Sequence, residues 1–90
     1  MSLSEEDLKQ LRIWIDQAII RAEEVVENFP EEKLLRSVRQ QLDFLFRVTR
    51  HSPSDAERKR FALELTARRL NSVDEELASL FARISNYFQF

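Results

Sequence analysis

The sequence predicts an all-α fold, a compact antiparallel bundle of four helices. Apolar residues recur every three or four positions, whereas the alternation typical of β-strands is nowhere sustained. The chain has no glycine, so its turns must be built from other residues. Three short breaks divide the chain: FPEE at 29–32, HSPSD at 51–55 and NSVD at 71–74. The predicted helices span about residues 5–29, 32–50, 55–71 and 73–88, and their short connections favour antiparallel neighbours.

The first helix is predicted to begin after Ser4, whose hydroxyl can accept a hydrogen bond from a free backbone N–H. Glu5, Glu6 and Asp7 then lie where the helix dipole favours negative charge. Pro30 disfavours helical geometry at the preceding residue and ends the segment. The residues at helical spacing that form its inward stripe are Leu8, Leu11, Ile15, Ala18, Ala22, Val25, Val26 and Phe29.

The second helix is also predicted to direct one face inward. That face comprises Leu34, Leu35, Val38, Leu42, Leu45, Phe46 and Thr49. The third and fourth helices are predicted to start with capping boxes at Ser54–Glu57 and Ser72–Glu75. In a capping box, a serine and a glutamate each accept a hydrogen bond from the other's backbone N–H. The fourth helix is predicted to bury Leu77, Leu80, Phe81, Ile84 and Phe88.

The third helix has two apolar sides. Leu63, Thr66, Ala67 and Leu70 share one side, and Phe61 and Leu65 share the other with several arginines. An inner helix of a bundle touches two neighbours, so packing alone could explain both sides.

The length and composition predict one helical domain, residues 1–90. The N-terminal MSLSEEDLK lacks the basic patch and apolar run of a secretory signal. No uncharged stretch approaches the roughly 20 residues that cross a bilayer. Without cysteine, neither a disulfide nor a thiolate metal site is available. We therefore expect a cytoplasmic protein that does not associate with membranes.

Three large apolar side chains are predicted to point away from the core. At about 100° per residue, Ile13 and Ile20 lie nearly opposite the inward stripe of the first helix and among acidic neighbours. Phe44, in the stretch LDFLF, projects about 120° from the centre of the inner face of its helix. Phe44 could cover an edge of the bundle or enter a groove of a partner.

Apolar residues ringed by one charge sign resemble a binding patch, in which buried anchors are surrounded by a polar rim. The charge is uneven along the chain: residues 1–28 have seven acidic and three basic side chains, and residues 33–69 have four acidic and ten basic ones. Such segments can pair internally or present one sign to a partner. The predicted partner-binding residues are Ile13, Asp16, Ile20, Glu24, Glu27, Phe44 and Arg47.

The sequence lacks the side-chain combinations that catalysis requires. His51 is the only histidine and lies in a predicted turn, so no second histidine can complete a metal site. Adjacent acidic pairs such as Glu23–Glu24 diverge on a helix, and a phosphate-binding glycine loop cannot form. We therefore expect no enzymatic activity, no metal and no cofactor.

A basic run around the second break raises the question of nucleic acid. Its residues are Arg50, Arg58, Lys59 and Arg60. The last three are consecutive and fan around a helix, and the isoelectric point of about 5.4 is acidic. A solvated helix face explains the run better, so no nucleic-acid partner is expected.

Several short motifs occur in a distinctive order along the chain. They are Ile15-Asp16-Gln17-Ala18, the Phe29-Pro30 turn, Leu35 and Ser37 leading to Gln41-Leu42-Asp43-Phe44, the Ser54-Asp55 turn, and Asp74-Glu75-Glu76-Leu77. Over about residues 13–88, this order resembles the small helical immunity proteins of bacterial type VI secretion systems that are paired with NAD(P)+ glycohydrolase toxins.

The resemblance implies a stoichiometric inhibitor that binds the catalytic domain of a cognate effector toxin and obstructs its substrate site. Such an antidote protects a bacterium from toxin delivered by its siblings and from its own. The alternative is a helical adaptor or a self-associating subunit, in which Ile13, Ile20 and Phe44 meet a second copy of the chain.

Overall fold

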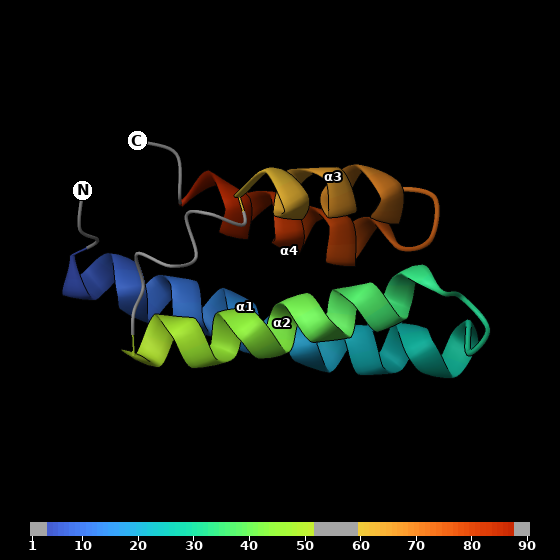
Figure 1. Cartoon of the computed structure of the whole chain (residues 1–90), viewed down its shortest axis with the longest axis horizontal. Helices are drawn as coiled ribbons and strands as arrows, with labels where there is room; N and C mark the ends of the chain where they lie inside the picture. Colours follow the sequence, from blue (N-terminus) through green and yellow to red (C-terminus); the bar gives the residue numbers. More distant parts are fainter. Residues whose placement is uncertain (1–3, 52–59, 88–90) are drawn as a thin grey trace.

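The computed structural model confirms the predicted all-α bundle (Figure 1). It describes residues 4–51 and 60–87, excluding the side chains of residues 51, 60 and 61. Within these residues the helices are α1 (Glu5–Asn28), α2 (Leu34–His51), α3 (Arg60–Leu70) and α4 (Glu75–Asn86). Helix α2 therefore begins two residues later than predicted and extends into the HSPSD break, so that His51 is its last residue.

The four helices follow one another around a ring. Helices α1 and α2 form one hairpin, α3 and α4 form a second, and α4 returns to pack against α1 (Figure 1). Helices α2 and α3 make the sparsest contact of the four adjacent pairs. The first hairpin is longer than the second, because α1 has 24 residues and α4 has 12. Each helix therefore has two neighbours and one face directed away from the bundle.

The core lies along the centre of this ring. Its largest fully buried side chains are Phe81, Leu11, Ile15, Leu42, Leu45, Leu63, Leu70, Leu77, Ile84, Val25 and Val38. Burial thus follows the predicted stripes of α1, α2 and α4, and in α3 it selects the side that contains Leu63 and Leu70. Leu65, on the other side of α3, is exposed.

Two residues predicted to be inward are exposed. Phe29 follows the last residue of α1, and its backbone leaves helical geometry at the turn before Pro30, so its side chain does not continue the stripe. Phe46 is 38% exposed. It lies about 60° from the centre of the inward face of α2, at the margin nearest α1, where the neighbouring helix does not cover it.

Helix α1 has the predicted serine cap, but α4 begins differently. The Ser4 hydroxyl accepts a hydrogen bond from the Asp7 N–H at 3.1 Å. At the start of α4 the capping residue is Asp74, not Ser72, and its carboxylate accepts from the Leu77 N–H at 2.9 Å. The Ser72 hydroxyl instead donates to the Arg69 carbonyl at the end of α3. The predicted capping box Ser54–Glu57, the basic pair Arg58–Lys59 and Phe88 lie outside the described residues.

The same Asp74 carboxylate joins the two hairpins. Arg21, in the middle of α1, donates from Nε to Oδ2 of Asp74 at 2.9 Å and from Nη2 to Oδ1 at 2.6 Å. Two-point pairing of this kind is stronger and more directional than a single contact. The Arg21 hydrogen bonds lower the pKa of Asp74, with a further contribution from the Leu77 N–H, and partial burial opposes the shift. The pairing also raises the pKa of Arg21 above its ordinary value.

A second arginine connects α1 to α2. The Arg12 guanidinium donates to the Thr49 carbonyl at 2.9 Å, near the end of α2. The last carbonyls of a helix lack partners within the helix and carry partial negative charge, so a cation there is favourable. The buried Thr49 hydroxyl is satisfied within α2, because it donates to the Leu45 carbonyl at 2.8 Å.

We predict that Asp74→Ala destabilises the fold more than Asp74→Asn. The alanine removes both the cap and the anion, and a cap alone contributes about 1 kcal/mol. The asparagine keeps a capping oxygen and removes only the charge. Urea denaturation at pH 7 measures both losses. Equal losses would show that the cap contributes nothing beyond the charge, and an unchanged stability of Asp74→Asn would show that the ion pair contributes nothing beyond the cap.

We also predict that the stability difference between the wild type and Asp74→Asn depends on pH. Because the folded protein lowers the pKa of Asp74 from its ordinary value of 3.8, the charged carboxylate contributes fully above that value. The contribution declines as the pH falls below 3.8 toward the lower folded pKa. Denaturation curves from pH 2 to 7 should therefore converge at acidic pH, and a constant difference would contradict this role.

Candidate functional site

The outer side of α1 carries the two isoleucines that the sequence directs away from the core. Ile13 is 45% exposed and Ile20 is 60% exposed. Their spacing of seven residues places them on one ridge of the helix, about two turns apart. Asp16, Glu24 and Glu27 are also exposed and follow the same ridge. The predicted residues on α1 therefore form a continuous apolar and acidic surface.

Helix α2 adds an aromatic and a basic side chain beside this ridge. The Arg50 guanidinium lies over the Phe46 ring, 3.7 Å from its centroid, and its Nη2 is 3.9 Å from Oδ1 of Asp16. These contacts link Phe46 to the α1 ridge. We define the α1–α2 face as Ile13, Asp16, Ile20, Phe46 and Arg50.

Neither Phe46 nor Arg50 was among the predicted binding residues. Their four-residue spacing is the one at which an arginine can reach an aromatic ring on the same helix surface, so a signal for the pair was present in the sequence. The spacing of apolar residues along α2 places Phe46 in the inward stripe. It does not show that Phe46 lies at the edge of this stripe that no other helix covers.

The remaining predicted residues of α2 lie elsewhere. Arg47 is exposed on the outward side of α2, and its Nε donates to the Asp43 carbonyl of the same helix at 3.4 Å. Phe44 is half-buried on the side of α2 that meets α3, and lines a pocket with Leu63. The seven predicted residues therefore do not form one patch. Phe44 lies on the side of α2 that meets α3, whereas the α1 ridge lies beyond the opposite side of α2.

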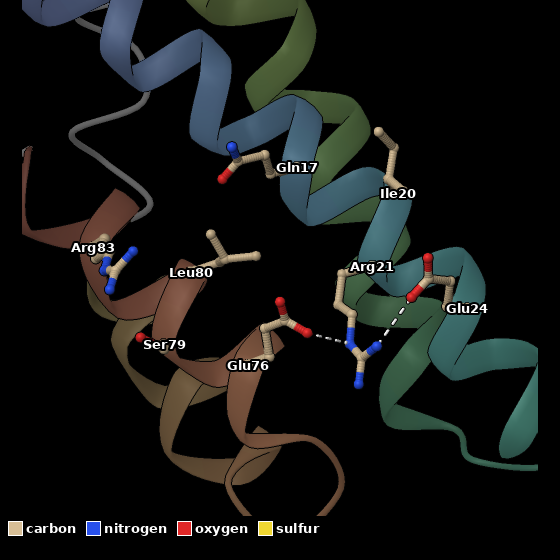
Figure 2. Close-up of a pocket in the computed structure, with 8 residues that line it drawn as sticks. All are labelled: Gln17, Ile20, Arg21, Glu24, Glu76, Ser79, Leu80 and Arg83. Atoms are coloured by element: carbon tan, nitrogen blue, oxygen red, sulfur yellow. Dashed lines mark hydrogen bonds and ion pairs between the residues drawn. The ribbon is translucent and has the colours of Figure 1, made fainter.

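A groove runs between α1 and α4, next to the α1 ridge (Figure 2). Its volume is about 520 Å³. Figure 2 shows Arg21 reaching toward Glu24 of its own helix and Glu76 of α4, and the two ion-pair distances are 2.9 and 3.0 Å. Ile20 lies at the α1 edge of the groove, where Figure 2 shows its side chain pointing away from α4, and Leu80 and Arg83 line the α4 side. Arg21 thus pairs with both of the glutamates that line the groove.

The described residues offer no metal centre, since none of their histidine and carboxylate side chains form a group of three or more that could hold an ion. None of the helices in this part of the chain is long and apolar enough to span a bilayer. The surface features that stand out are therefore the exposed apolar side chains, with charged neighbours, on helix faces that no other helix covers.

A family comparison identifies the kind of protein that carries these faces. The model of the Tsi6 family matches residues 10–89, most of the chain. The chain belongs to the Tsi6 family. Tsi6 proteins are type VI secretion immunity proteins, non-enzymatic inhibitors that neutralise an effector toxin. Searches of curated proteins and of solved structures find no match.

Membership of the Tsi6 family confirms the immunity class indicated by the sequence motifs, and it implies a cognate effector as the partner. Ile13, Ile20 and Phe46 of the α1–α2 face are exposed and are not part of the buried core.

We predict that Ile20→Asp changes the free energy of unfolding by no more than about 0.5 kcal/mol, as is usual for exposed positions. Phe46→Ala should cost more than this but less than a truncation in the core, because Phe46 is only 38% exposed. Leu42→Ala is the buried comparison on α2 and should cost about 2–5 kcal/mol, because it leaves a cavity. Thermal and urea denaturation measure all three. A loss at Ile20 comparable to that at Leu42 would assign Ile20 to the core.

Proposed function

We propose that this Tsi6-family protein neutralises an NAD(P)+ glycohydrolase effector by covering its catalytic site with the α1–α2 face. The observation that carries the proposal is the exposure of Ile13 and Ile20 on one ridge, with Phe46 beside them. The class of effector is supported by the order of sequence motifs from Ile15-Asp16-Gln17-Ala18 onward.

The α1–α2 face has the composition of a small binding hot spot. Burying a large apolar side chain completely contributes about 1.5–3 kcal/mol, so Ile13, Ile20 and Phe46 can anchor a complex. Asp16 and Arg50 stand between these anchors, and their separation of 3.9 Å leaves both free to reorient toward a partner. Glu24 and Glu27 extend the ridge as an acidic rim, and Arg47 extends it over the outward side of α2.

The acidic ridge suits the proposed target electrostatically. NAD(P)+ contains a pyrophosphate, so an enzyme that binds it must hold negative charge in its substrate site. The carboxylates of Asp16, Glu24 and Glu27 would be attracted by the positive potential of the effector's substrate site, which also attracts the dinucleotide. Opposite charges steer partners together before contact and raise the association rate.

We predict that Ile20→Asp weakens effector binding by about 30-fold or more, the loss that corresponds to a hot-spot anchor of 2 kcal/mol. Phe46→Ala should weaken it in the same direction. The measurement is NAD+ hydrolysis by the effector's catalytic domain, which wild-type protein should abolish at one molecule per toxin. Leu65→Asp is the matched control, because Leu65 is similarly exposed but lies on α3.

Full inhibition by the Ile20→Asp and Phe46→Ala proteins would reject the α1–α2 face. An effector that is inhibited one-to-one, yet does not hydrolyse NAD+ or NADP+ when free, would reject the proposed toxin class and leave the face intact. The two parts of the proposal are therefore tested separately.

We predict that association slows as salt rises, because ions screen the acidic ridge over about 8–10 Å at physiological salt. The double variant Asp16→Asn/Glu24→Gln should associate more slowly than the wild type at low salt and lose most of that difference at high salt. Stopped-flow or surface-plasmon measurements of the association rate test this. An unchanged rate would mean that the acidic ridge does not face the effector.

Self-association through the same face is the second candidate function, and the exposure of Ile13 and Ile20 favours it equally. It requires a dimer at micromolar concentration, which light scattering would detect. If the protein is a monomer and binds the effector, self-association is excluded and only the immunity function remains.

A further inference from the structure

The outward side of α2 is basic, whereas the ridge of α1 beside it is acidic. Helix α2 contains four arginines and one acidic residue, Asp43. Three of these arginines, Arg36, Arg39 and Arg47, are exposed and are called the α2 arginines below. Arg36 and Arg47 are 11 residues apart, so that they lie within about 20° of each other around the helix axis. They therefore form a row of positive charge along the side of α2 that faces away from the bundle.

The α2 arginines are not neutralised within the part of the chain that the structure describes. The ion pairs there belong to Arg21 and Arg50, and none of the α2 arginines takes part in one. Arg39 lines a small pocket between α1 and α2 with Glu23 and Asp43, but pairs with neither of them. Arginine binds carboxylates through two parallel hydrogen bonds, so these guanidinium groups have donors to offer to carboxylates of another molecule.

The two rows of opposite charge belong to one surface. Helices α1 and α2 pack against each other, and the axes of packed helices are about 8–10 Å apart. Phe46 lies between the acidic ridge of α1 and Arg47, and Arg50 of α2 reaches to 3.9 Å from Asp16 of α1. A protein interface of ordinary size covers about 800 Å² of each partner, roughly 30 Å across. A partner that covers the α1–α2 face therefore also meets the α2 arginines.

This arrangement restricts which effector surface can bind. In the proposed complex, the acidic ridge of α1 lies against the positive substrate site of the effector. If the effector were positive over its whole contact surface, the α2 arginines would face charges of their own sign. Like charges that face each other across an interface strongly oppose binding. The α1–α2 face can therefore cover the effector only if acidic side chains lie opposite α2.

We propose that the α2 arginines bind a cluster of aspartate and glutamate side chains at the edge of the effector's substrate site. The inference rests on the proposed function, in which the α1–α2 face covers that site. It adds the orientation of the complex, because two parallel rows of opposite charge match a complementary surface in only one direction. Half a turn about the axis of approach would place like charges together. The apolar side chains anchor the complex, and the two charged rows select its orientation.

The first test measures the rate of association with the effector's catalytic domain by stopped flow. Arg36→Gln/Arg47→Gln should associate about threefold or more slowly than the wild type at low salt, because it removes the attraction to the acidic cluster. The difference should vanish in about 1 M salt, where charges act over only about 3 Å. A uniformly positive effector would bind this variant faster, and arginines that contact only solvent would leave the rate unchanged. Either result would overturn the proposal.

The acidic and basic variants together exclude an effect of overall charge. Asp16→Asn/Glu24→Gln removes negative charge from α1, and Arg36→Gln/Arg47→Gln removes positive charge from α2. We expect both to slow association, whereas an effect of net charge would change the two rates in opposite directions. Arg68→Gln/Arg69→Gln is the matched control, since it removes the same charge from exposed positions on α3 and should associate at nearly the wild-type rate. An equal decrease in this control would overturn the proposal.

The second test identifies the groups that contact the α2 arginines. Arg36→Lys and Arg47→Lys, made separately, keep the positive charge and introduce a primary amine. A carbodiimide joins such an amine to a carboxylate in direct contact with it. In complexes with the effector's catalytic domain, mass spectrometry should find position 36 or 47 joined to an aspartate or glutamate of the effector. Arg68→Lys is the matched control and should give no such product. Complexes that form without a cross-link at either position would overturn the proposal.

The outcomes separate this inference from the proposed function. If Ile20→Asp weakens binding while Arg36→Gln/Arg47→Gln associates at the wild-type rate, the acidic contact is rejected and the proposed function stands. If Ile20→Asp inhibits the effector fully while the arginine variant associates slowly, the apolar anchor is rejected and the acidic contact at α2 stands.

Discussion

The two-point ion pair between Arg21 and Asp74 determines how the two helix hairpins meet. Each hairpin has its own turn and its own apolar stripe, but a stripe can slide along its partner at little cost. The guanidinium of Arg21 approaches the carboxylate at 2.9 and 2.6 Å, and the same carboxylate caps the first turn of α4. One side chain thus specifies both where α4 begins and where it lies along α1. Hydrophobic burial stabilises the bundle, and this directional contact selects one alignment of it.

Each of the four helices has two neighbours in the ring. Every helix therefore keeps one face that points away from the bundle and is covered by no other helix. The core needs only the central stripe of every helix, and the largest buried side chains all belong to those stripes. Side chains at the margins are covered or exposed according to the distance to the adjacent helix. On α2 this places Phe46 at an exposed margin near α1 and Phe44 at a half-buried margin near α3. The two aromatic residues of LDFLF therefore belong to different surfaces.

This division of roles suits a Tsi6 immunity protein, whose task is to bind and not to catalyse. Because the core alone stabilises the fold, residues on the outward faces can be substituted with little loss of stability. In the proposed complex, the apolar side chains of the α1–α2 face would be the anchors and the charged groups beside them would form the rim.

The sequence by itself determined the helical class, the Ser4 cap, the core stripes of α1 and α4, and the outward direction of Ile13 and Ile20. These features depend on the rotation of about 100° per residue and on hydrogen bonds between residues three or four apart, so they are written into local spacing. Only the tertiary structure decided that Phe46 is exposed, that Asp74 instead of Ser72 caps α4, and that Gln41 lacks a partner. Arg21 and Asp74 are 53 residues apart in the chain, and the extent to which Phe46 and Gln41 are covered depends on how closely α1 and α3 pack against α2. Contacts of this kind depend on the distance between packed helices, which no local spacing of residues contains.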